Sequence, residues 1–431
     1  MTAPGPPGTP IPDALAELRW RGLISQCTDE RALADAMAAG PVTYYGGFDP
    51  TAPSLHIGNL VLILTLRRLQ LAGHRPIALV GGATGLIGDP KPTSERQLND
   101  RDVVADWVER IGRQIEPYLA LDGPNAAQMV NNLDWTSGMS AIEFLRDIGK
   151  HFRVGRMIAK EAVSARLNSE AGISYTEFSY QILQAMDFLQ LYRRTGCTLQ
   201  LGGSDQWGNL TAGTDLIHRV TGAAVHAVAT PLITKADGSK FGKTEGGTIW
   251  LDPQLTTPYA LFQFWLNVED AKTDEYLRVF TFRSRDEIAE LGDATRDRPA
   301  ARVAQRVLAR DVVTMVHGDE VARRVEEASR ALFGSGELAA LDPSTLSDAL
   351  AELPTVRRGR GDHSVAELMA EGGLVTSRSA ARRTITEGGA YVNNRKVGVQ
   401  DATVGVSDLV HDRWLVLRRG RRSLMAVELT G

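Results

Sequence analysis

The sequence predicts an α/β protein in which a doubly wound, mostly parallel sheet is followed by an α-helical domain and a small α+β domain. Three observations lead to this expectation. Short apolar runs alternate with helical patterns between about residues 40 and 233. Residues 258–333 are helical in pattern without strand-like alternation, and residues 363–431 mix short helices with β-like segments. A chain of 431 residues is also too long for a single core.

The elements of the sheet domain follow in order after a Pro- and Gly-rich leader, residues 1–13, which is expected to be disordered. A helical pattern covers residues 14–39 and stops at Gly40-Pro41. Strands are expected at residues 42–45, 76–80, 128–132, 198–201 and 225–233. Helices are expected at residues 60–68, 101–119, 141–167, 175–194 and about 205–219.

Beyond the sheet domain, a Gly- and Lys-containing loop is expected at residues 234–252, a helical domain at 253–345 and a charged linker at 346–362. The last domain, residues 363–431, is expected to hold two helices, at 365–371 and 377–387, and three strands, at 390–392, 408–410 and 414–417.

Composition indicates a soluble globular chain, with 43% hydrophobic and 23% charged residues. The longest apolar run, residues 60–66, is too short to cross a bilayer, and the first residues lack the basic and apolar regions of a signal peptide. The two cysteines, Cys27 and Cys197, form no CxxC pair, so neither a disulfide framework nor a cysteine zinc site is indicated. We therefore expect a cytoplasmic protein without a membrane partner.

Charge is distributed unevenly along the chain, whose net charge is −4. Residues 355–431 contain 13 Lys and Arg against 8 Asp and Glu, whereas the remainder is acidic. A basic C-terminal domain on an acidic body suggests an anionic partner for that domain.

The stretch that organises the sheet domain is residues 42–66. A short strand, two glycines, a Pro-containing turn and a helix form the first half of a nucleotide-binding βαβ unit. His56 and Gly58 lie at the expected helix start, where free N–H groups and the helix dipole suit a polyphosphate and glycine leaves room for a flat ligand. The alternative is a structural helix cap with an exposed histidine.

Two further patterns carry candidate chemistry. Lys240 and Lys243 flank Phe241-Gly242 on a Gly-rich loop and can fold over a triphosphate, although a solvated basic turn is the alternative. Tyr180, Gln184 and Asp187 are spaced i, i+4, i+7, so that one helix face presents all three. The alternative for that face is a half-buried polar stripe.

These residues lead to a family resemblance. The segment HIGN at residues 56–59 resembles the HIGH motif of class I aminoacyl-tRNA synthetases, and KFGKT at 240–244 resembles their KMSKS loop in the form typical of tyrosyl-tRNA synthetases. Four longer segments look like bacterial tyrosyl-tRNA synthetases in the same order and at about the same spacing: YYGGFDPTAPSLHIGN, GGATGLIGDP, YTEFSYQILQAMDF and LQLGGSDQWGNLTAG. The resemblance begins at about residue 14 and implies a Rossmann-like catalytic domain (14–233), an anticodon-recognition role for the helical domain, and a homodimer.

The resemblance implies a two-step reaction. L-Tyrosine and ATP form tyrosyl-adenylate and pyrophosphate, and the tyrosyl group is then transferred to the 3′ end of tRNA(Tyr). Because the attacking carboxylate is ionised at neutral pH, catalysis requires positioning and charge stabilisation rather than a general base. Mg²⁺ is expected to arrive with ATP, and no protein-bound metal is expected.

The resemblance also assigns residues to three groups. The catalytic group is Thr51, His56, Asn59, Lys240, Lys243 and Thr244. The tyrosine-binding group is Tyr45, Asp89, Tyr180, Gln184, Asp187 and Gln206. The ATP-binding group is Gly47, Asp49, His56, Gly58, Gly203, Asp205 and Lys243. Asp49 is a candidate for the substrate ammonium as well as for the ribose. In the tyrosine-binding group, Tyr45 would donate to the substrate phenol and Asp187 would accept from it, so phenylalanine would leave both unpaired.

Three positions depart from the family pattern. Asn59 replaces the second histidine of the HIGH motif, and Gly46 replaces a cysteine that touches the ribose in many relatives. The loop after Asp89 is altered, which leaves Arg96 as a pyrophosphate candidate there.

The C-terminal segment GLVTSRSAARRTITEGGAYVNNRKV resembles an S4-type RNA-binding domain. The resemblance implies phosphate contacts from five basic residues: Arg378, Arg382, Arg383, Arg395 and Lys396. A solvated basic face is the alternative.

Two other functions compete with this interpretation. A tryptophanyl-tRNA synthetase shares the fold and motifs, but an indole only donates a hydrogen bond, whereas Tyr45 with Asp187 suits a hydroxyl. The second rival is an RNA-binding protein, such as an intron-splicing factor, built on an inactive synthetase scaffold.

Overall fold

The computed structural model describes residues 11–90, 98–158, 161–168, 172–244, 247–334, 336–420 and 423–430. Most of the expected leader, residues 1–10, lies outside these ranges. The chain forms two compact units, Met1–Leu255 with Glu269–Ala301 and Thr256–Val268 with Arg302–Gly431. The helical region after residue 253 is thus divided between the units. The domain boundaries inferred from the sequence stay a prediction, apart from the linker at 346–362 that is discussed below.

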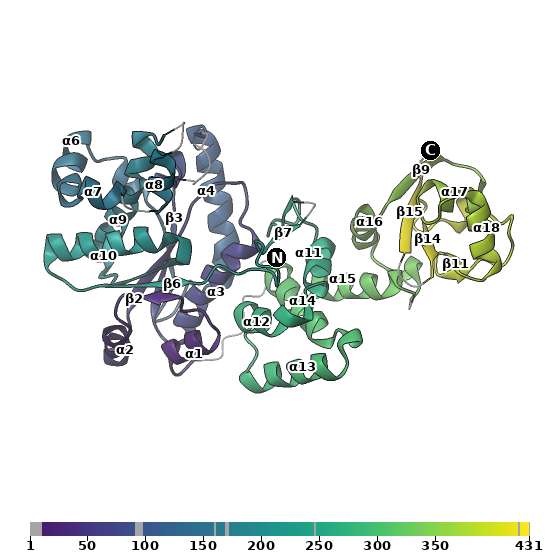
Figure 1. Cartoon of the computed structure of the whole chain (residues 1–431), viewed down its shortest axis with the longest axis horizontal. Coiled ribbons are helices and arrows are strands. Elements are labelled where there is room, and N and C mark those ends of the chain that lie inside the picture. Colours follow the sequence, from purple (N-terminus) through teal and green to yellow (C-terminus); the bar gives the residue numbers. More distant parts are fainter. Residues whose placement is uncertain are drawn as a thin grey trace. The chain divides into compact units, whose positions relative to one another are not determined.

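The first unit is built on a six-stranded sheet with the order β1-β6-β5-β2-β3-β4 (Figure 1). Its strands are β1 Gln26–Cys27, β2 Thr43–Phe48, β3 Arg75–Val80, β4 Gln128–Asn131, β5 Leu199–Gly203 and β6 His226–Thr230. Strands β2 to β6 pair in parallel and β1 pairs antiparallel with β6, which confirms the doubly wound, mostly parallel sheet. The strand order reverses between β2 and β5, and sheets of this kind bind ligands outside the carboxyl ends of the strands at such a point.

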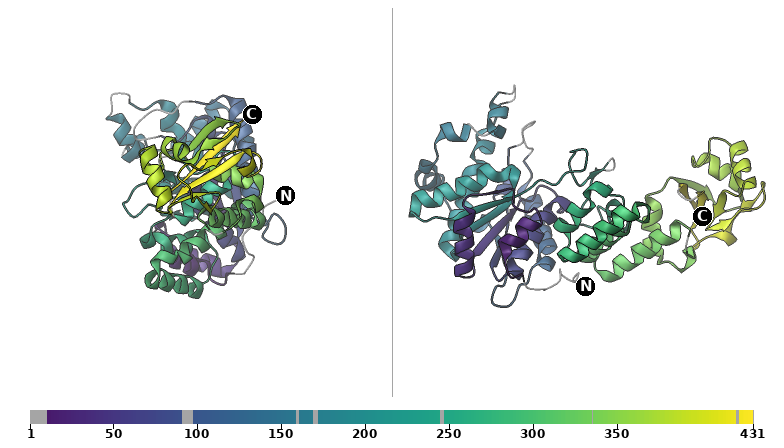
Figure 2. Two further views of the ribbon diagram at one scale, coloured as in Figure 1. Left: turned by 90° about the vertical axis from the view of Figure 1, so that its right-hand side faces the viewer. Right: turned by 60° about the horizontal axis from the view of Figure 1, so that its bottom comes forward.

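Helices cover both faces of this sheet (Figures 1 and 2). Helices α3 (Ile57–Leu71) and α4 (Arg101–Ile115) lie on one face, and α9 (Tyr175–Thr195) and α10 (Trp207–Thr221) lie on the other. Because successive strand residues face opposite sides, Tyr44 donates its hydroxyl to the Leu66 carbonyl of α3 at 2.6 Å. Tyr45 instead packs in the core on the α9 side, where its hydroxyl is available to the site.

Two expected helices are interrupted. The pattern at 14–39 is not one helix, since β1 lies between α1 (Ala14–Trp20) and α2 (Glu30–Ala39). Gly22 has a φ of +74°, which ends the first helix, and Asp29 starts the second by accepting from the Ala32 N–H at 2.9 Å.

The expected helix at 141–167 is likewise a series of short pieces. They are α6 Ala141–Glu143, a π-helix Phe144–Ile148, a 3₁₀-helix Gly149–His151, α7 Val154–Ile158 and α8 Glu161–Leu167. An extended residue, Phe152, separates α7 from the turns before it.

The first unit ends with a small hairpin, β7 (Lys243–Thr244) with β8 (Gly247–Thr248), and two helices, α12 (Asp270–Phe280) and α13 (Arg285–Asp297). Ser284 with Glu287 forms a capping box at the start of α13.

The second unit contains a helical part and a five-stranded sheet with the order β12-β11-β14-β15-β9. Its helices are α11 Pro258–Leu266, α14 Val303–His317, α15 Asp319–Leu332, α16 Pro343–Ala351, α17 Val365–Glu371 and α18 Arg378–Thr386. The sheet strands are β9 Thr355–Gly359, β11 Ala390–Val392, β12 Arg395–Lys396, β14 Trp414–Arg419 and β15 Ser423–Thr430; β10 (His363–Ser364) pairs separately with β13 (Thr403–Val404).

Two expectations for this unit were wrong. Residues 346–362 are not a linker, because they contain most of α16 and all of β9, which pairs in parallel with β15 and buries Val356. Residues 408–410 are not a strand, because a 3₁₀-helix, Val406–Asp408, precedes a tight turn at His411 and Asp412, which have φ angles of +50° and +54°.

Candidate active site

Polar residues gather at the carboxyl ends of the parallel strands, where the strand order reverses. Asp49 follows β2, the turn from Gly81 to Thr84 follows β3, and Asn132 follows β4. The side chain of Thr84 donates to Asp49 Oδ1 at 2.7 Å. A Cβ atom at residue 81 would lie 2.1 Å from Asp49 Oδ1 and 2.2 Å from Thr84 Oγ1, so only glycine leaves room for this bond.

Asp187, on the inner face of α9, is a buried carboxylate with two donors. It accepts from Asn132 Nδ2 at 2.9 Å and from Trp135 Nε1, on the short helix α5 (Leu133–Thr136), at 2.8 Å. Burial raises the pKa of Asp187 to about 7, against the two hydrogen bonds, which lower it. Each carboxylate oxygen can accept a second bond, so the group remains open to a ligand donor.

Tyr45, on β2, lies near this carboxylate. Its ring is 5.3 Å from that of Phe188, and its hydroxyl is buried without a hydrogen-bond partner among the described residues. Burial raises the pKa of Tyr45 well above its usual value, and the charge of Asp187 raises it further. The Oε1 atom of Gln184 is also buried and lacks a partner in the part of the chain that the structure describes. Buried polar atoms of this kind are rare unless a ligand or water completes them.

A continuous hydrogen-bonded chain links Asp187 to a second carboxylate. Asn132 Nδ2 donates to Thr84 Oγ1 at 3.0 Å as well as to Asp187. Thr84 donates to Asp49, and Asp49 Oδ2 accepts from the Tyr180 hydroxyl at 2.5 Å. Asp49, which the resemblance grouped with ATP, thus contacts Tyr180 of the tyrosine-binding group.

Asp89 and Gln206 form a second pair at the same edge of the sheet. Gln206 Nε2 donates to Asp89 Oδ2 at 2.8 Å, and Asn209 Nδ2 donates to Gln206 Oε1 at 2.8 Å and to Asp89 Oδ1 at 3.3 Å. At the last residue of β5, a Cβ atom on Gly203 would lie 2.5 Å from Asp205 Oδ1, so glycine allows that carboxylate to approach the backbone.

The HIGN segment caps helix α3. His56 Nδ1 accepts from the Gly58 N–H at 3.1 Å, and the His56 N–H donates to Asn59 Oδ1 at 3.0 Å. Since Nδ1 accepts, the ring proton belongs on Nε2. Burial lowers the pKa of His56, and the charge of Lys243 lowers it further, whereas a hydrogen bond with the backbone of His56 itself acts in the opposite direction. His56 is therefore both a helix cap and a neutral hydrogen-bond donor at the N-terminus of a helix.

The loop that carries Lys240 and Lys243, residues 234–252 (the lysine loop), is joined to the start of α3 by main-chain contacts. The Ile57 N–H donates to the Ile249 carbonyl at 3.1 Å, and His56 pairs with Trp250 in an isolated bridge. Lys240 and Lys243 have exposed side chains, which leaves them available to an anion.

Of the remaining candidate residues, two are exposed to solvent and two lie wholly or partly outside the described residues. Thr51 is exposed, with its N–H bonded to the Asp49 carbonyl at 2.9 Å. Gly47 is exposed and has open space where a Cβ would lie. The side chain of Thr244 and the whole of Arg96 lie outside the described residues.

Four residues of the site were not predicted: Thr84, Asn132, Trp135 and Asn209. Asn132 was the last residue of an expected strand, and Thr84 lay in an expected glycine turn. A polar residue at the carboxyl end of a parallel strand was therefore a usable signal. Trp135 and Asn209 gave no such signal in the sequence, because their roles depend on which side chains the fold places beside them.

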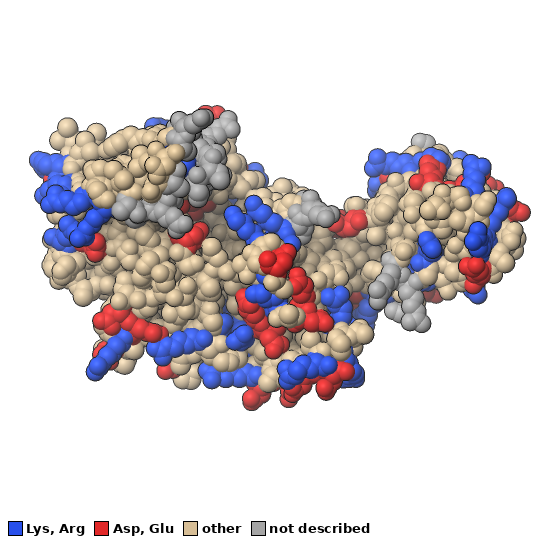
Figure 3. Space-filling view, in the orientation of Figure 1, with Lys and Arg blue, Asp and Glu red and all other residues tan. Residues whose placement is uncertain are grey.

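The five basic candidates of the C-terminal domain are exposed. Figure 3 shows Lys and Arg side chains on the surface of this part of the chain. On α18, Arg378 pairs with Glu367 at 2.9 Å and Arg382 pairs with Asp401 at 3.0 Å, while Arg383 is exposed beside them. Arg395 and Lys396 form β12, and Lys396 extends over Gly388 just beyond the end of α18. The structure thus brings Lys396 close to the helix that carries the arginines.

Two features are absent from the described residues. These residues contain no group of three or more His, Cys, Asp or Glu that could hold a metal ion. They also contain no helix that is both long and apolar enough to cross a membrane.

Comparison with known proteins shows which family the chain belongs to. Residues 37–334 match the family described as tRNA synthetases class I (W and Y), and residues 345–427 match the tyrosine–tRNA ligase SYY-like C-terminal domain. A tyrosine–tRNA ligase from Streptomyces avermitilis is 67% identical over 97% of this chain and 99% of its own length. A C-terminally truncated mitochondrial tyrosyl-tRNA synthetase from Coccidioides posadasii has a TM-score of 0.65 and 31% identity over 73% of this chain and 90% of its own.

The chain therefore belongs to the class I tRNA synthetases, which are ATP-using ligases. A tryptophanyl-tRNA synthetase from Encephalitozoon cuniculi, 16% identical with a TM-score of 0.53 over 72% of this chain and 87% of its own, shares the fold alone. Within the class, the high identity to tyrosine–tRNA ligases over nearly the whole chain identifies this protein as a member of the tyrosine–tRNA ligase family.

Proposed function

We propose that this site activates L-tyrosine with ATP to form tyrosyl-adenylate and pyrophosphate, and that the tyrosyl group is then transferred to tRNA(Tyr). The observation that carries the proposal is the buried, unpartnered hydroxyl of Tyr45 near the carboxylate of Asp187. A phenol both donates and accepts, so it can satisfy both groups at once. An indole would leave the Tyr45 hydroxyl without an acceptor, which favours tyrosine over tryptophan.

The other tyrosine-binding candidates suit the amino-acid backbone. Tyr180, Gln184 and Asp89 would bind the substrate ammonium, and Gln206 would lie by the α-carboxylate. The hydrogen bonds of Asp49 to Tyr180 and of Asp89 to Gln206 support this assignment, because they fix the orientation of the groups that would meet the substrate.

Residues at the start of α3 and in the lysine loop would bind the phosphates of ATP and the pyrophosphate that leaves. His56, donating from Nε2, and Thr51 would contact the transferring phosphates, while Lys240, Lys243 and Thr244 would close over the pyrophosphate. Gly47, Gly58 and Gly203 leave room for the nucleotide, and Asp205 would bind its ribose. Preorganised donors and cations of this kind stabilise charge as it develops, and Mg²⁺ would accompany ATP.

The C-terminal domain would supply phosphate contacts to structured RNA from α18 and β12. Intact Lys240, Lys243, His56 and Asp187 count against the rival in which the chain is only an RNA-binding scaffold. We further propose a cytoplasmic homodimer. Support for the dimer comes from large apolar side chains that are exposed on α6, on the π-helix after it and on α7, namely Ile142, Leu145, Val154 and Ile158.

The decisive experiment is ATP–pyrophosphate exchange with each amino acid in turn, without RNA. Exchange with tyrosine at least about 10³-fold above the others is the expected result, since a buried hydroxyl-recognising site strongly rejects analogues that lack the hydroxyl. Preference for tryptophan, or exchange with none, would refute the proposal.

A further inference from the structure

Phe241 lies between the two lysines and is held by aromatic rings of α12. Its ring centroid is 4.8 Å from that of Tyr276 and 5.3 Å from that of Phe280, with the Phe280 ring stacked at 26°. Tyr276 and Phe280 are four residues apart on one face of α12. The tripeptide that carries Lys240 and precedes Lys243 is therefore anchored by the side chain in its middle.

The loop has two further attachments, one on each side of Phe241. The Tyr276 hydroxyl donates to the carbonyl of Thr234 at 3.0 Å, and Thr234 pairs with Lys240 in an isolated bridge. On the other side, Gly242 has a φ of +78°, and a Cβ atom there would lie 2.9 Å from Ile57 Cγ1. The backbone of the loop thus passes directly over the first residue of α3.

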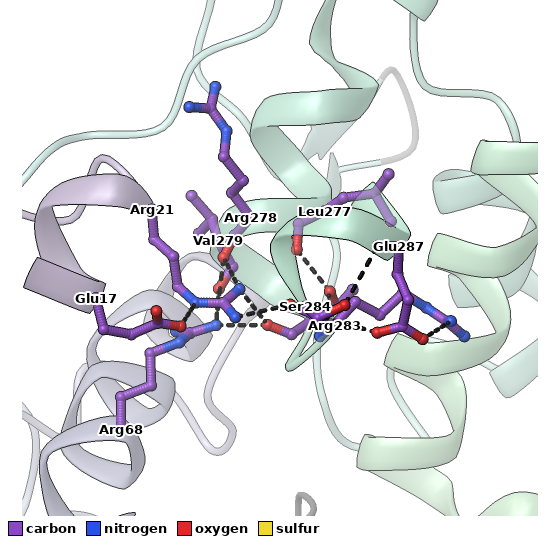
Figure 4. A network of polar contacts seen from close by, with 10 residues as sticks. Glu17, Arg21, Arg68, Leu277, Arg278, Val279, Arg283, Ser284 and Glu287 are labelled. Carbon is purple, nitrogen blue, oxygen red and sulfur yellow. Dashed lines mark hydrogen bonds and ion pairs between the residues drawn. The ribbon is translucent and has the colours of Figure 1, made fainter. Parts of the chain in front are cut away.

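The carboxyl end of α12 is fixed in turn by two buried arginines (Figure 4). Arg21 donates to the carbonyls of Arg278 at 2.7 Å and Thr281 at 2.9 Å. Arg68, on α3, donates to the carbonyls of Val279 at 2.8 Å and Thr281 at 2.7 Å. These groups satisfy the unpaired carbonyls of a helix end and place positive charge at its negative pole. Because Arg68 lies on the helix that His56 begins, α12 and the phosphate-binding end of α3 are held to one another.

We propose that α12 holds the lysine loop in place, and that Phe241, Tyr276 and Phe280 are positioning residues for Lys240 and Lys243. This inference rests on the proposed function of those lysines toward pyrophosphate. The rings hold the loop backbone against α12, and Gly242 lets the backbone approach Ile57. Lys240 and Lys243 therefore extend from a backbone segment that is held in one position. None of the three rings touches a reacting atom, and their effect is on the population of the loop position in which the lysines reach the phosphates.

The test compares Phe241→Leu and Tyr276→Phe with Lys243→Ala, and uses Phe333→Leu as a control on an exposed aromatic residue that follows α15. Steady-state kcat for ATP–pyrophosphate exchange, the tyrosine Kd from equilibrium dialysis and amide hydrogen exchange over residues 234–251 are measured. Phe241→Leu is expected to lower kcat by about 2- to 13-fold for each aromatic pair that the substitution removes. Tyrosine Kd should stay within about twofold, while hydrogen exchange of the loop accelerates. Tyr276→Phe keeps the ring, and its expected loss is about fivefold.

A double variant separates this inference from the proposed function. If Phe241 acts through the two lysines, Phe241→Leu lowers kcat by a smaller factor in the Lys243→Ala background than in the wild type. The inference is overturned if the two substitutions lower kcat by independent factors that multiply in the double variant. It is also overturned if Phe241→Leu and Tyr276→Phe both keep the wild-type kcat and the wild-type amide hydrogen exchange of the loop. Either result leaves the role of Lys243 intact. Wild-type kcat in Lys243→Ala overturns the proposed function of the loop itself.

Discussion

Replacing Asp187 by asparagine tests the tyrosine pocket at its buried carboxylate. The substitution keeps the size of the side chain but leaves one acceptor oxygen where Asn132, Trp135 and the substrate phenol all donate. Loss of a hydrogen bond to a charged group costs about 1.5–3 kcal/mol, so kcat/KM for tyrosine in the exchange assay should fall by about 10- to 150-fold.

The same variant should change the pH dependence of the enzyme. With a pKa of about 7 in the free protein, the Asp187 carboxylate becomes available to the phenol only as the pH rises through neutrality. The wild-type kcat/KM for tyrosine should therefore rise about tenfold per pH unit below about pH 6 and level off above about pH 8. The corresponding step should be missing from the profile of Asp187→Asn.

Protein stability should change in the opposite direction. A carboxyl whose pKa is raised by folding binds its proton more tightly in the folded state. Its contribution to stability is therefore complete below about pH 4 and is lost as the pH rises to about 7, by roughly 4 kcal/mol. Urea unfolding at about pH 5 and about pH 8 should show a larger decrease for the wild type than for Asp187→Asn.

Two results would refute this reasoning. Wild-type exchange by Asp187→Asn would mean that the carboxylate does not recognise the phenol. Equal pH dependence of both stability and kcat/KM in the two proteins would mean that another group titrates near neutrality.

Three other changes test separate parts of the molecule. Lys243→Ala should lower kcat for adenylate formation by about 10²-fold with nearly unchanged tyrosine Kd, and equal losses in both would show that the loop is only structural. Gly81→Ala should raise the tyrosine KM, because its methyl would separate Asp49 from Thr84; an unchanged KM at wild-type melting temperature would contradict this. Deleting residues 355–431 should spare adenylate formation but impair tRNA charging, and full charging across a range of salt would argue against an RNA role for this domain.

Much of the fold followed from local patterns in the sequence. Strands β2, β3 and β5 were predictable because a glycine pair lies within or directly after each apolar run. The residues of β1 fall within a helical pattern, because pairing with β6 is a long-range contact with no local signal. The charged segment RRGRG, residues 357–361, is typical of a linker. In the structure its first residues belong to β9, which pairs with β15 at the edge of the sheet and buries the preceding Val356.

The candidate site was predictable to a similar extent. The spacing of Tyr180, Gln184 and Asp187 indicated one helix face, and all three contribute buried atoms to the same region. The donors that orient Asp187 were not predictable, since Asn132 and Trp135 meet it only after β4 has taken its place beside β3.

The pairing of β9 with β15 joins the two ends of the C-terminal domain. Gly359 is the register partner of Thr430, so the last residues of the chain complete their sheet only when the segment just after α16 is present. An isolated fragment that starts at residue 363 would expose a long apolar edge on β15 and invite aggregation. A fragment intended for spectroscopy, or for grafting this domain onto another enzyme, should therefore begin near residue 353.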